Sequence, residues 1–386
     1  MDFTFTEEQE AVAQAAASVF DGMVTPARVA EIERTEERVD GDLWAALARS
    51  NLLGLAVAEE DGGSGLGLTE VCLVLEQQGR AVAPVPLWAT TVLGAMPLSH
   101  FGSPTQKSRW LPGVVAGEVK LTAALTEVAA STTERPAVTA TAGGGRWTLS
   151  GTTRNVPQAH VADRVLLPAR TDDGVIVVLV DPTGPGATLE RATTTDRQIH
   201  PHLHLDGVAV DDTDVVVGPA DGASAVTWML ERARTGLCAL QLGVTEEAIR
   251  RAALYLNERH QFGRPLSSFQ GTMLRAADAY IDSEAIRVTL WQAAWRLDTG
   301  RPATDAVAVA KWWASEAGQR VVHATQHLHG GMGADIEYPI HRYFLWGKQI
   351  ELMLEGPSAQ LARMGAALAA RYRQPDSAPA ASGGGR

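Results

Sequence analysis

Arg259 and Phe262 carry side chains that could hold a dinucleotide. Arg259 directly follows a stretch of helical periodicity, and Phe262 comes shortly after it. A guanidinium presents a planar fork of N–H donors that can clamp a pyrophosphate, and a phenylalanine offers an apolar face to a flat ring. Taken alone, the pair is explained more simply by an exposed arginine and a core phenylalanine. The two residues therefore indicate a dinucleotide site and leave the structural explanation open.

Metal chemistry has weaker support. His200, His202 and His204 alternate in a β-type segment, which would place them on one face of a strand. No fourth ligand is evident, and solvent-facing histidines explain the spacing, so no metal site is predicted. Cys72 and Cys238 lack the spacing of a zinc or redox motif and are expected to be buried, inert thiols.

The composition is that of a globular protein with two or three packed units, because 45% of the 386 residues are hydrophobic. The formal net charge of −12 opposes nucleic-acid binding, so a phosphate-bearing ligand must be met by local arginines or helix N-termini. The sequence shows neither a signal peptide nor an apolar run of the roughly 20 residues that a membrane helix needs. A cytoplasmic location without membrane contact is expected.

These candidate residues must be positioned by an α+β architecture. Helical periodicity begins at Thr6, a candidate N-cap, and is broken at 59–67 by a glycine-rich loop. Short runs of β-branched residues replace it, and long helical stripes follow; one stripe, 307–328, uses small residues that let helix backbones approach closely. The predicted units are an N-terminal helical domain (1–118), a small middle β-barrel domain (119–219), a C-terminal helical bundle (220–372) and a disordered tail (373–386).

Several motifs in this order resemble the acyl-CoA dehydrogenase family. They are RHQFGRPLSSFQ at 259–270, QHLHGGMG at 326–333, YPI at 338–340, the loop EEDGGSG at 59–65 and Thr126-Glu127. The resemblance covers nearly the whole chain and implies the acyl-CoA dehydrogenase fold. It also implies that flavin adenine dinucleotide (FAD) is the cofactor and that an acyl-CoA thioester is the substrate.

The resemblance assigns roles to particular residues. In the family, the residues matching Arg259 and Gln270 contact FAD that is held mainly by a neighbouring subunit, and the Gly330-Gly331 pair lets the backbone approach the same cofactor. Arg234 matches a family arginine near the substrate site. The complete set of expected cofactor-binding residues is Arg259, Gln261, Phe262, Gln270, His327, Gly330 and Gly331.

The family reaction also needs a carboxylate base, which takes the α proton of the thioester while the flavin accepts hydride from the β carbon. Glu355 matches the base in a Tyr-Glu-Gly-Thr type stretch, and an apolar pocket would raise the pKa of such a residue. Counting from the Tyr338-Pro landmark, however, places the base at Leu354. The extra residue turns a helical side chain by about 100°. The other family location for the base is occupied by Ala233, with Glu231 two residues away.

Other departures fall in the chain's own flavin half-site. Residues 155–158 read Asn-Val-Pro-Gln where the family has Trp-Ile-Thr-Asn, residues 128–132 lack the usual loop after Thr126-Glu127, and His327 replaces a glutamine. By contrast, the segment with Arg259, Phe262 and Gln270, which in the family contributes to a neighbouring subunit's flavin site, is retained. This pattern, together with YFLWGKQIEL at 343–352, resembles the non-catalytic chain of actinobacterial two-chain (α2β2) acyl-CoA dehydrogenases, many of which act on steroid side-chain thioesters.

Two alternatives remain at this point. The chain could be a self-sufficient homotetrameric dehydrogenase that uses Glu355 as the base, or a scaffold subunit that has lost flavin altogether. The expected partners are an acyl-CoA substrate, a second acyl-CoA dehydrogenase chain and, by family resemblance only, an electron-transfer flavoprotein.

Overall fold

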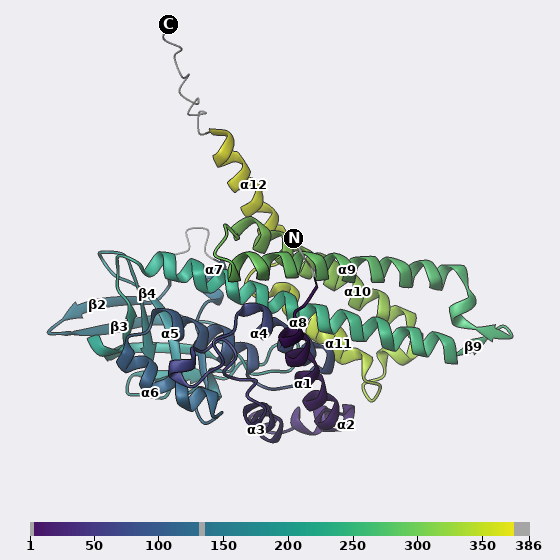
Figure 1. Ribbon diagram of the computed structural model, residues 1–386, viewed down its shortest axis with the longest axis horizontal. Helices are drawn as coiled ribbons and strands as arrows, with labels where there is room; N and C mark the ends of the chain where they lie inside the picture. Colours follow the sequence, from purple (N-terminus) through teal and green to yellow (C-terminus); the bar gives the residue numbers. More distant parts are fainter. Residues whose placement is uncertain (1–3, 131–135, 374–386) are drawn as a thin grey trace, which may run out of the picture.

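The computed structural model describes residues 4–130 and 136–373, which form an N-terminal helical part, a sheet at one end of the molecule and a C-terminal helical bundle that packs directly on the N-terminal helices (Figure 1). The order of helical, β and helical parts confirms the expected fold class. The predicted tail beyond Arg373 and positions 131–132 of the altered loop lie outside the described residues. The domain limits themselves stay a prediction.

The N-terminal part begins at the predicted capping residue. Thr6 Oγ1 accepts a hydrogen bond from the Gln9 backbone N–H, and Gln9 Oε1 accepts one from the Thr6 N–H, which closes a capping box. The glycine-rich loop separates two of its helices as expected. The elements are α1 (Glu7–Met23), α2 (Pro26–Ile32), α3 (Gly41–Arg49), α4 (Leu68–Ala81), a π-helical turn (Ala89–Ala95), α5 (Met96–Phe101) and α6 (Pro104–Val115).

The middle part is an eight-stranded sheet with strand order β6-β7-β3-β2-β4-β5-β8, in which β1 pairs with β4. Most neighbouring strands are antiparallel, and a bulge interrupts the β3–β7 pairing between Leu149 and Gly151. The strands are β1 (Leu121–Ala123), β2 (Thr139–Gly143), β3 (Arg146–Thr153), β4 (Arg164–Arg170), β5 (Val175–Val180), β6 (Ala187–Glu190), β7 (His202–Asp211) and β8 (Val215–Val217). The short helix α7 (Thr126–Ala130) follows β1.

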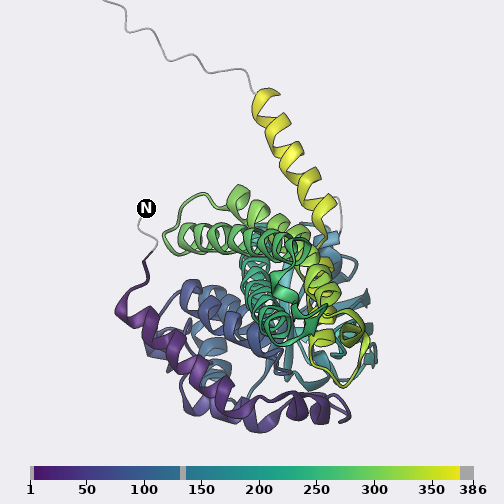
Figure 2. The same ribbon diagram turned by 90° about the vertical axis from the view of Figure 1, so that its right-hand side faces the viewer.

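Long helices form the C-terminal part, and α8, α9 and α10 lie side by side in both views (Figures 1 and 2). Small residues allow this packing: a Cβ on Gly318 of α10 would lie 2.0 Å from the Gln241 side chain of α8. The helices are α8 (Gly222–Glu258), α9 (Gln270–Asp298), α10 (Thr304–Leu328), α11 (Ile340–Leu352) and α12 (Pro357–Arg373). A hairpin, β9 (His260–Gln261) and β10 (Arg264–Pro265), joins α8 to α9.

Two further features bear on function. Helix α12 projects away from the rest of the chain (Figure 2). Within residues 4–130 and 136–373, no helix combines the length and the hydropathy needed to span a membrane.

Candidate functional site

The expected cofactor-binding residues gather at one end of the helical bundle. Arg259 ends α8, Gln261 and Phe262 belong to the β9–β10 hairpin, and Gln270 begins α9. His327 lies in the last turn of α10, and the Gly330-Gly331 pair follows that helix. All seven expected residues are exposed. Residues that lie far apart in the sequence therefore share one surface, at the end marked β9 in Figure 1.

Phe262 is the most unusual residue of this surface. Its side chain is 91% exposed, and its backbone adopts a left-handed conformation with φ 54°. Its ring faces Phe269 edge-on, at a centroid distance of 6.2 Å and an interplanar angle of 75°. A core role for Phe262 is therefore wrong. A bulky side chain held in a strained turn and exposed to water is typical of a residue with a binding role.

A hollow beside the hairpin has room for part of a dinucleotide. Its volume is about 500 Å³, within the range of small-molecule sites. Cβ atoms built on Gly271, Gly330 and Gly331 would meet no atom within 4 Å, so the backbone is open to close approach. The residues that line the hollow are Leu256, Leu266, Gly271, Thr272, Arg275, His327 and Leu328. This half-site fits FAD, with Arg259 available for the pyrophosphate and Phe262 for an aromatic ring.

Glu355 lies in a different environment, in the link between α11 and α12. Leu354 and Glu355 both have left-handed backbones, with φ 52° and 81°, so the extra residue is absorbed in a tight turn rather than in a helix. The Glu355 carboxylate accepts hydrogen bonds from Arg234 Nη2 at 3.0 Å and from Arg363 Nε at 2.6 Å and Nη2 at 3.1 Å. The side chains of Glu355 and Arg234 are only 11% and 9% exposed.

This setting does not suit a general base. Two guanidinium groups hold both carboxylate oxygens of Glu355 in hydrogen bonds, whereas a base must point a carboxylate oxygen at the substrate proton. Glu355 is therefore held between two arginines and not in the apolar pocket that would suit a base. Arg234, the expected substrate-binding residue, is buried and bonded to the same carboxylate. Arg363 is the second arginine bonded to Glu355. No sequence motif marks it, so the sequence did not predict its role.

The other positions for a base offer no carboxylate to a substrate. Leu354, at the register position of the family glutamate, is 3% exposed and belongs to the main hydrophobic core. Ala233 is fully buried. Glu231 is bonded to Thr304, whose Oγ1 donates to Glu231 Oε1 at 2.7 Å.

The altered stretch at 155–158 borders only a small cavity. A cavity of about 30 Å³, enough for one or two water molecules, lies beside Pro157 and Gln158 of the altered stretch. Its remaining walls come from the helical parts and from the loop before β7: Gln78, Val85, Trp88, Asp196, Gln198, His200, Leu237, Leu240, Trp346, Ile350 and Met353. This volume is too small for a three-ring isoalloxazine. Next to the altered stretch, Thr126 Oγ1 donates a hydrogen bond to the Asn155 carbonyl at 3.1 Å.

Two buried titratable groups in this small cavity were not anticipated. Asp196 accepts hydrogen bonds from Thr194 and Gln198, yet burial raises its pKa to about 6. His200 is 4% exposed, and burial lowers its pKa to about 3, so the expectation that it faces solvent is wrong. His202 and His204 are bonded to Asn155 and Glu190, respectively. The described residues contain no group of three potential metal ligands.

Both the N-terminal and the C-terminal parts of this chain match a known protein family. The sequence profile of the acyl-CoA dehydrogenase N-terminal domain matches residues 6–118, and that of the C-terminal domain matches residues 220–368. The chain is 38% identical over 377 residues to the acyl-CoA dehydrogenase FadE27 of Mycobacterium tuberculosis, covering 96% of this chain and 99% of the relative.

Two similar solved structures are named as pairs of proteins. A variant of the Tcur3481-Tcur3483 steroid ACAD is 46% identical, with a TM-score of 0.89 and coverage of 95% of this chain and 99% of that one. The ChsE4-ChsE5 complex from Mycobacterium tuberculosis is 39% identical, with a TM-score of 0.90 and coverage of 96% and 99%. The chain therefore belongs to the acyl-CoA dehydrogenase family of FAD-binding oxidoreductases, which act on CH–CH bonds.

Proposed function

We propose that this chain is the non-catalytic subunit of a two-chain acyl-CoA dehydrogenase and that it completes the flavin site of a catalytic partner. The observation that carries the proposal is the contrast between its two half-sites. The cavity beside Pro157 and Gln158, where the family resemblance would place this chain's own flavin, has a volume of only about 30 Å³, whereas the hollow beside the hairpin is open and about 500 Å³ in volume. Such a chain gains a complete flavin site only by joining another.

An exposed apolar stripe on α9 supports the proposal that a second chain binds here. The stripe consists of two rows with seven-residue spacing, which lie on one side of the helix: Met273 and Tyr280, and Leu274, Ile281 and Val288. Each of these side chains is more than half exposed. The opposite side of α9 is buried against α8 and α10. Exposed apolar surface of this kind marks a protein interface, and the stripe starts beside the outward-facing flavin half-site. We infer that a second acyl-CoA dehydrogenase chain covers it, in an α2β2 assembly.

The described residues suggest how this chain would contribute to the site. Arg259 would bind the FAD pyrophosphate, Phe262 would cover an apolar ring face, and Gln270 would donate or accept a hydrogen bond at the start of α9. The exposed Gly330-Gly331 backbone would lie against the cofactor. When bound, FAD accepts hydride from the β carbon of the acyl chain, and the base that removes the α proton would come from the partner.

The substrate and the electron acceptor are part of the proposal. One similar structure is described as a steroid ACAD, and a pocket divided between unlike chains can accommodate a bulky acyl group. We therefore favour a steroid side-chain CoA thioester as the substrate. An electron-transfer flavoprotein is the proposed acceptor, on family resemblance.

The proposal is tested by flavin content. FAD per chain is measured by absorbance for this chain purified alone and for the same chain co-purified with its partner. We expect an apoprotein alone and one FAD per two chains in the complex. Full flavin occupancy of the chain alone would instead support a self-sufficient homotetramer, and a flavin-free complex would support a scaffold subunit.

Arg259 provides a second test in the same complex. Arg259→Met should release FAD and leave the assembly intact, because Arg259 is exposed and ends a helix. Arg301→Met is the matched control, because Arg301 is also exposed but lies at the opposite end of α9, after Asp298. Equal FAD retention in both variants would contradict the proposed role of Arg259.

A further inference from the structure

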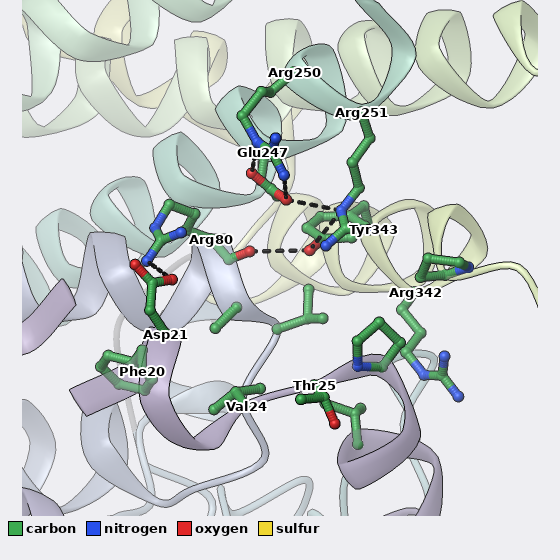
Figure 3. Close-up of a pocket in the computed structure, with 15 residues that line it drawn as sticks. Phe20, Asp21, Val24, Thr25, Arg80, Glu247, Arg250, Arg251, Arg342 and Tyr343 are labelled. Atoms are coloured by element: carbon green, nitrogen blue, oxygen red, sulfur yellow. Dashed lines mark hydrogen bonds and ion pairs between the residues drawn. The ribbon is translucent and has the colours of Figure 1, made fainter. Parts of the chain in front are cut away.

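An arginine-rich cavity lies at the junction between the N-terminal helices and the bundle (Figure 3). Its lining shares no residue with the hollow beside the hairpin. Its volume is about 140 Å³. Arg80 of α4, Arg250 and Arg251 of α8, and Tyr343 of α11 lie along one side. Phe20, Val24 and Thr25 lie along the other side in the same view. The cavity therefore has a cationic roof and a largely apolar floor.

The charge balance of the lining favours an anion. Four arginines and two carboxylates line the cavity, in a chain whose overall net charge is −12. The four arginines are Arg80, Arg250, Arg251 and Arg342, and the two acids are Asp21 and Glu247. Arg342 is neutralised by a bidentate pair with Glu33, which lies outside the lining, so the excess is carried by Arg80, Arg250 and Arg251. A local excess of positive charge on an acidic protein is unexpected for packing alone, and it attracts anions selectively to this point.

The arginines are held in place without exhausting their donors. Arg80 Nη2 pairs with Asp21 at 2.7 Å, and Arg250 binds Glu247 through Nε at 2.6 Å and Nη2 at 2.7 Å. Arg251 Nε lies 2.8 Å from Glu247. Within the described part of the chain, no hydrogen bond uses Nη1 of Arg80 or Arg250, or either Nη atom of Arg251. Carboxylates on one side of each guanidinium thus leave N–H donors for a ligand.

Tyr343 stiffens the same roof. Its hydroxyl donates to the Arg80 carbonyl at 3.0 Å and accepts from Arg251 Nε at 3.2 Å. The Arg251 guanidinium also stacks over the Tyr343 ring, 5.2 Å from the centroid. Burial raises the pKa of Tyr343 to about 12, so the hydroxyl keeps its proton at neutral pH. Preorganised donors of this kind reduce the cost of binding.

From this geometry we propose that the cavity is a phosphate-binding site formed by Arg80, Arg250 and Arg251. A guanidinium cluster matches the several acceptor oxygens of a phosphate dianion. The small volume suits one phosphate group, and the apolar floor of Phe20, Val24 and Val82 suits a short apolar body attached to it. The ligand is either free inorganic phosphate or a phosphomonoester. This site is separate from the proposed flavin half-site and does not depend on it.

The test is calorimetric titration of the full chain with inorganic phosphate, at ionic strength matched with sodium chloride. We expect one saturable site per chain. Arg80→Met and Arg251→Met should each weaken binding at least tenfold, because each removes a guanidinium from the roof. Arg146→Met is the control, since Arg146 is also paired with a carboxylate, that of Asp211 at 2.6 Å, but lies in the β3 strand outside the cavity.

Phenyl phosphate separates the two ligand sources. If it binds at least fivefold more tightly than inorganic phosphate, and Arg251→Met weakens it, the natural ligand is a phosphomonoester; equal affinities identify free phosphate. Tyr343→Phe keeps the shape of the cavity and should weaken phosphate binding severalfold. This variant keeps the proposal testable if an arginine variant does not fold. Absence of saturable phosphate binding to the wild-type chain, or equal binding by all variants, would overturn the proposal.

Discussion

At the scale of single residues, Glu355 shows how one inserted position changes a chemical role. Sequence reasoning placed a glutamate next to the glycine of a family motif and noted that the register was off by one. It could not show where the side chain would point, because the left-handed backbone of Leu354 and Glu355 depends on the helices that flank the turn. Arg363, on α12, could not be paired with Glu355 from the sequence either. In this structure the carboxylate is part of an ion-pair cluster.

Substitution of Glu355 by Gln separates the two roles. The change keeps the side-chain shape but removes the negative charge between Arg234 and Arg363, so we expect stability to fall by roughly 2 kcal/mol while turnover of the complex per folded protein changes less than twofold. Urea unfolding and steady-state kinetics measure the two effects. A drop in kcat of a hundredfold or more, with unchanged stability, would instead make Glu355 the base.

Phe262 supports a prediction of the opposite kind. Because its side chain is 91% exposed, Phe262→Ala should leave the thermal midpoint of the isolated chain unchanged. In the complex it should weaken FAD binding about tenfold, since an apolar contact to an aromatic ring is worth roughly 1–2 kcal/mol. Tyr372→Ala, at a residue of α12 that is 90% exposed, is the matched control. Equal FAD dissociation constants for the two variants, from fluorescence titration, would count against a role for Phe262.

At the scale of elements, the helices were predicted better than the contacts between them. Periodicity and the Thr6 cap identify α1 directly, and the small-residue stripe of α10 predicted close packing that Gly318 and Gln241 show. By contrast, nothing in the local sequence predicted that Lys311 of α10 would be fully buried. Its Nζ donates to the carbonyl oxygens of Ile350 at 3.1 Å and Glu351 at 3.2 Å, at the C-terminus of α11.

Lys311 predicts a specific pH dependence of stability. Burial lowers its pKa from 10.5 to about 8, so between these pH values the unfolded chain binds more protons at this residue than the folded chain does. The free energy of unfolding should therefore rise with pH in this window, by at most about 1.4 kcal/mol per unit from this group. Lys311→Met should remove that contribution. Urea unfolding of both proteins between pH 8 and 9.5 tests it, and parallel slopes would contradict it.

At the scale of the whole molecule, the family and the order of helical, β and helical parts could be read from the sequence because the motifs are local. The small cavity beside residues 155–158 could be predicted from the sequence only in part. The Asn-Val-Pro-Gln replacement at 155–158 indicated a loss, but the wall contributed by Trp88, Trp346 and Met353 depends on segments that are brought together only by folding. The cationic cavity of Arg80, Arg250 and Arg251 was not anticipated for the same reason, because it joins α4 to α8 and α11.

The exposed stripe of α9 yields the prediction that concerns the assembly. Ile281 is 64% exposed and lies at the centre of the stripe, so Ile281→Lys should leave the isolated chain folded. In the complex a buried lysine without a partner is costly, and each apolar side chain lost from the interface removes roughly 1.5–3 kcal/mol. We therefore expect light scattering to show dissociation of the α2β2 assembly into smaller species, with loss of FAD. Leu352→Lys, at a residue of α11 that is 61% exposed, should leave the mass unchanged. If Ile281→Lys also assembles fully and retains FAD, the partner chain does not cover α9.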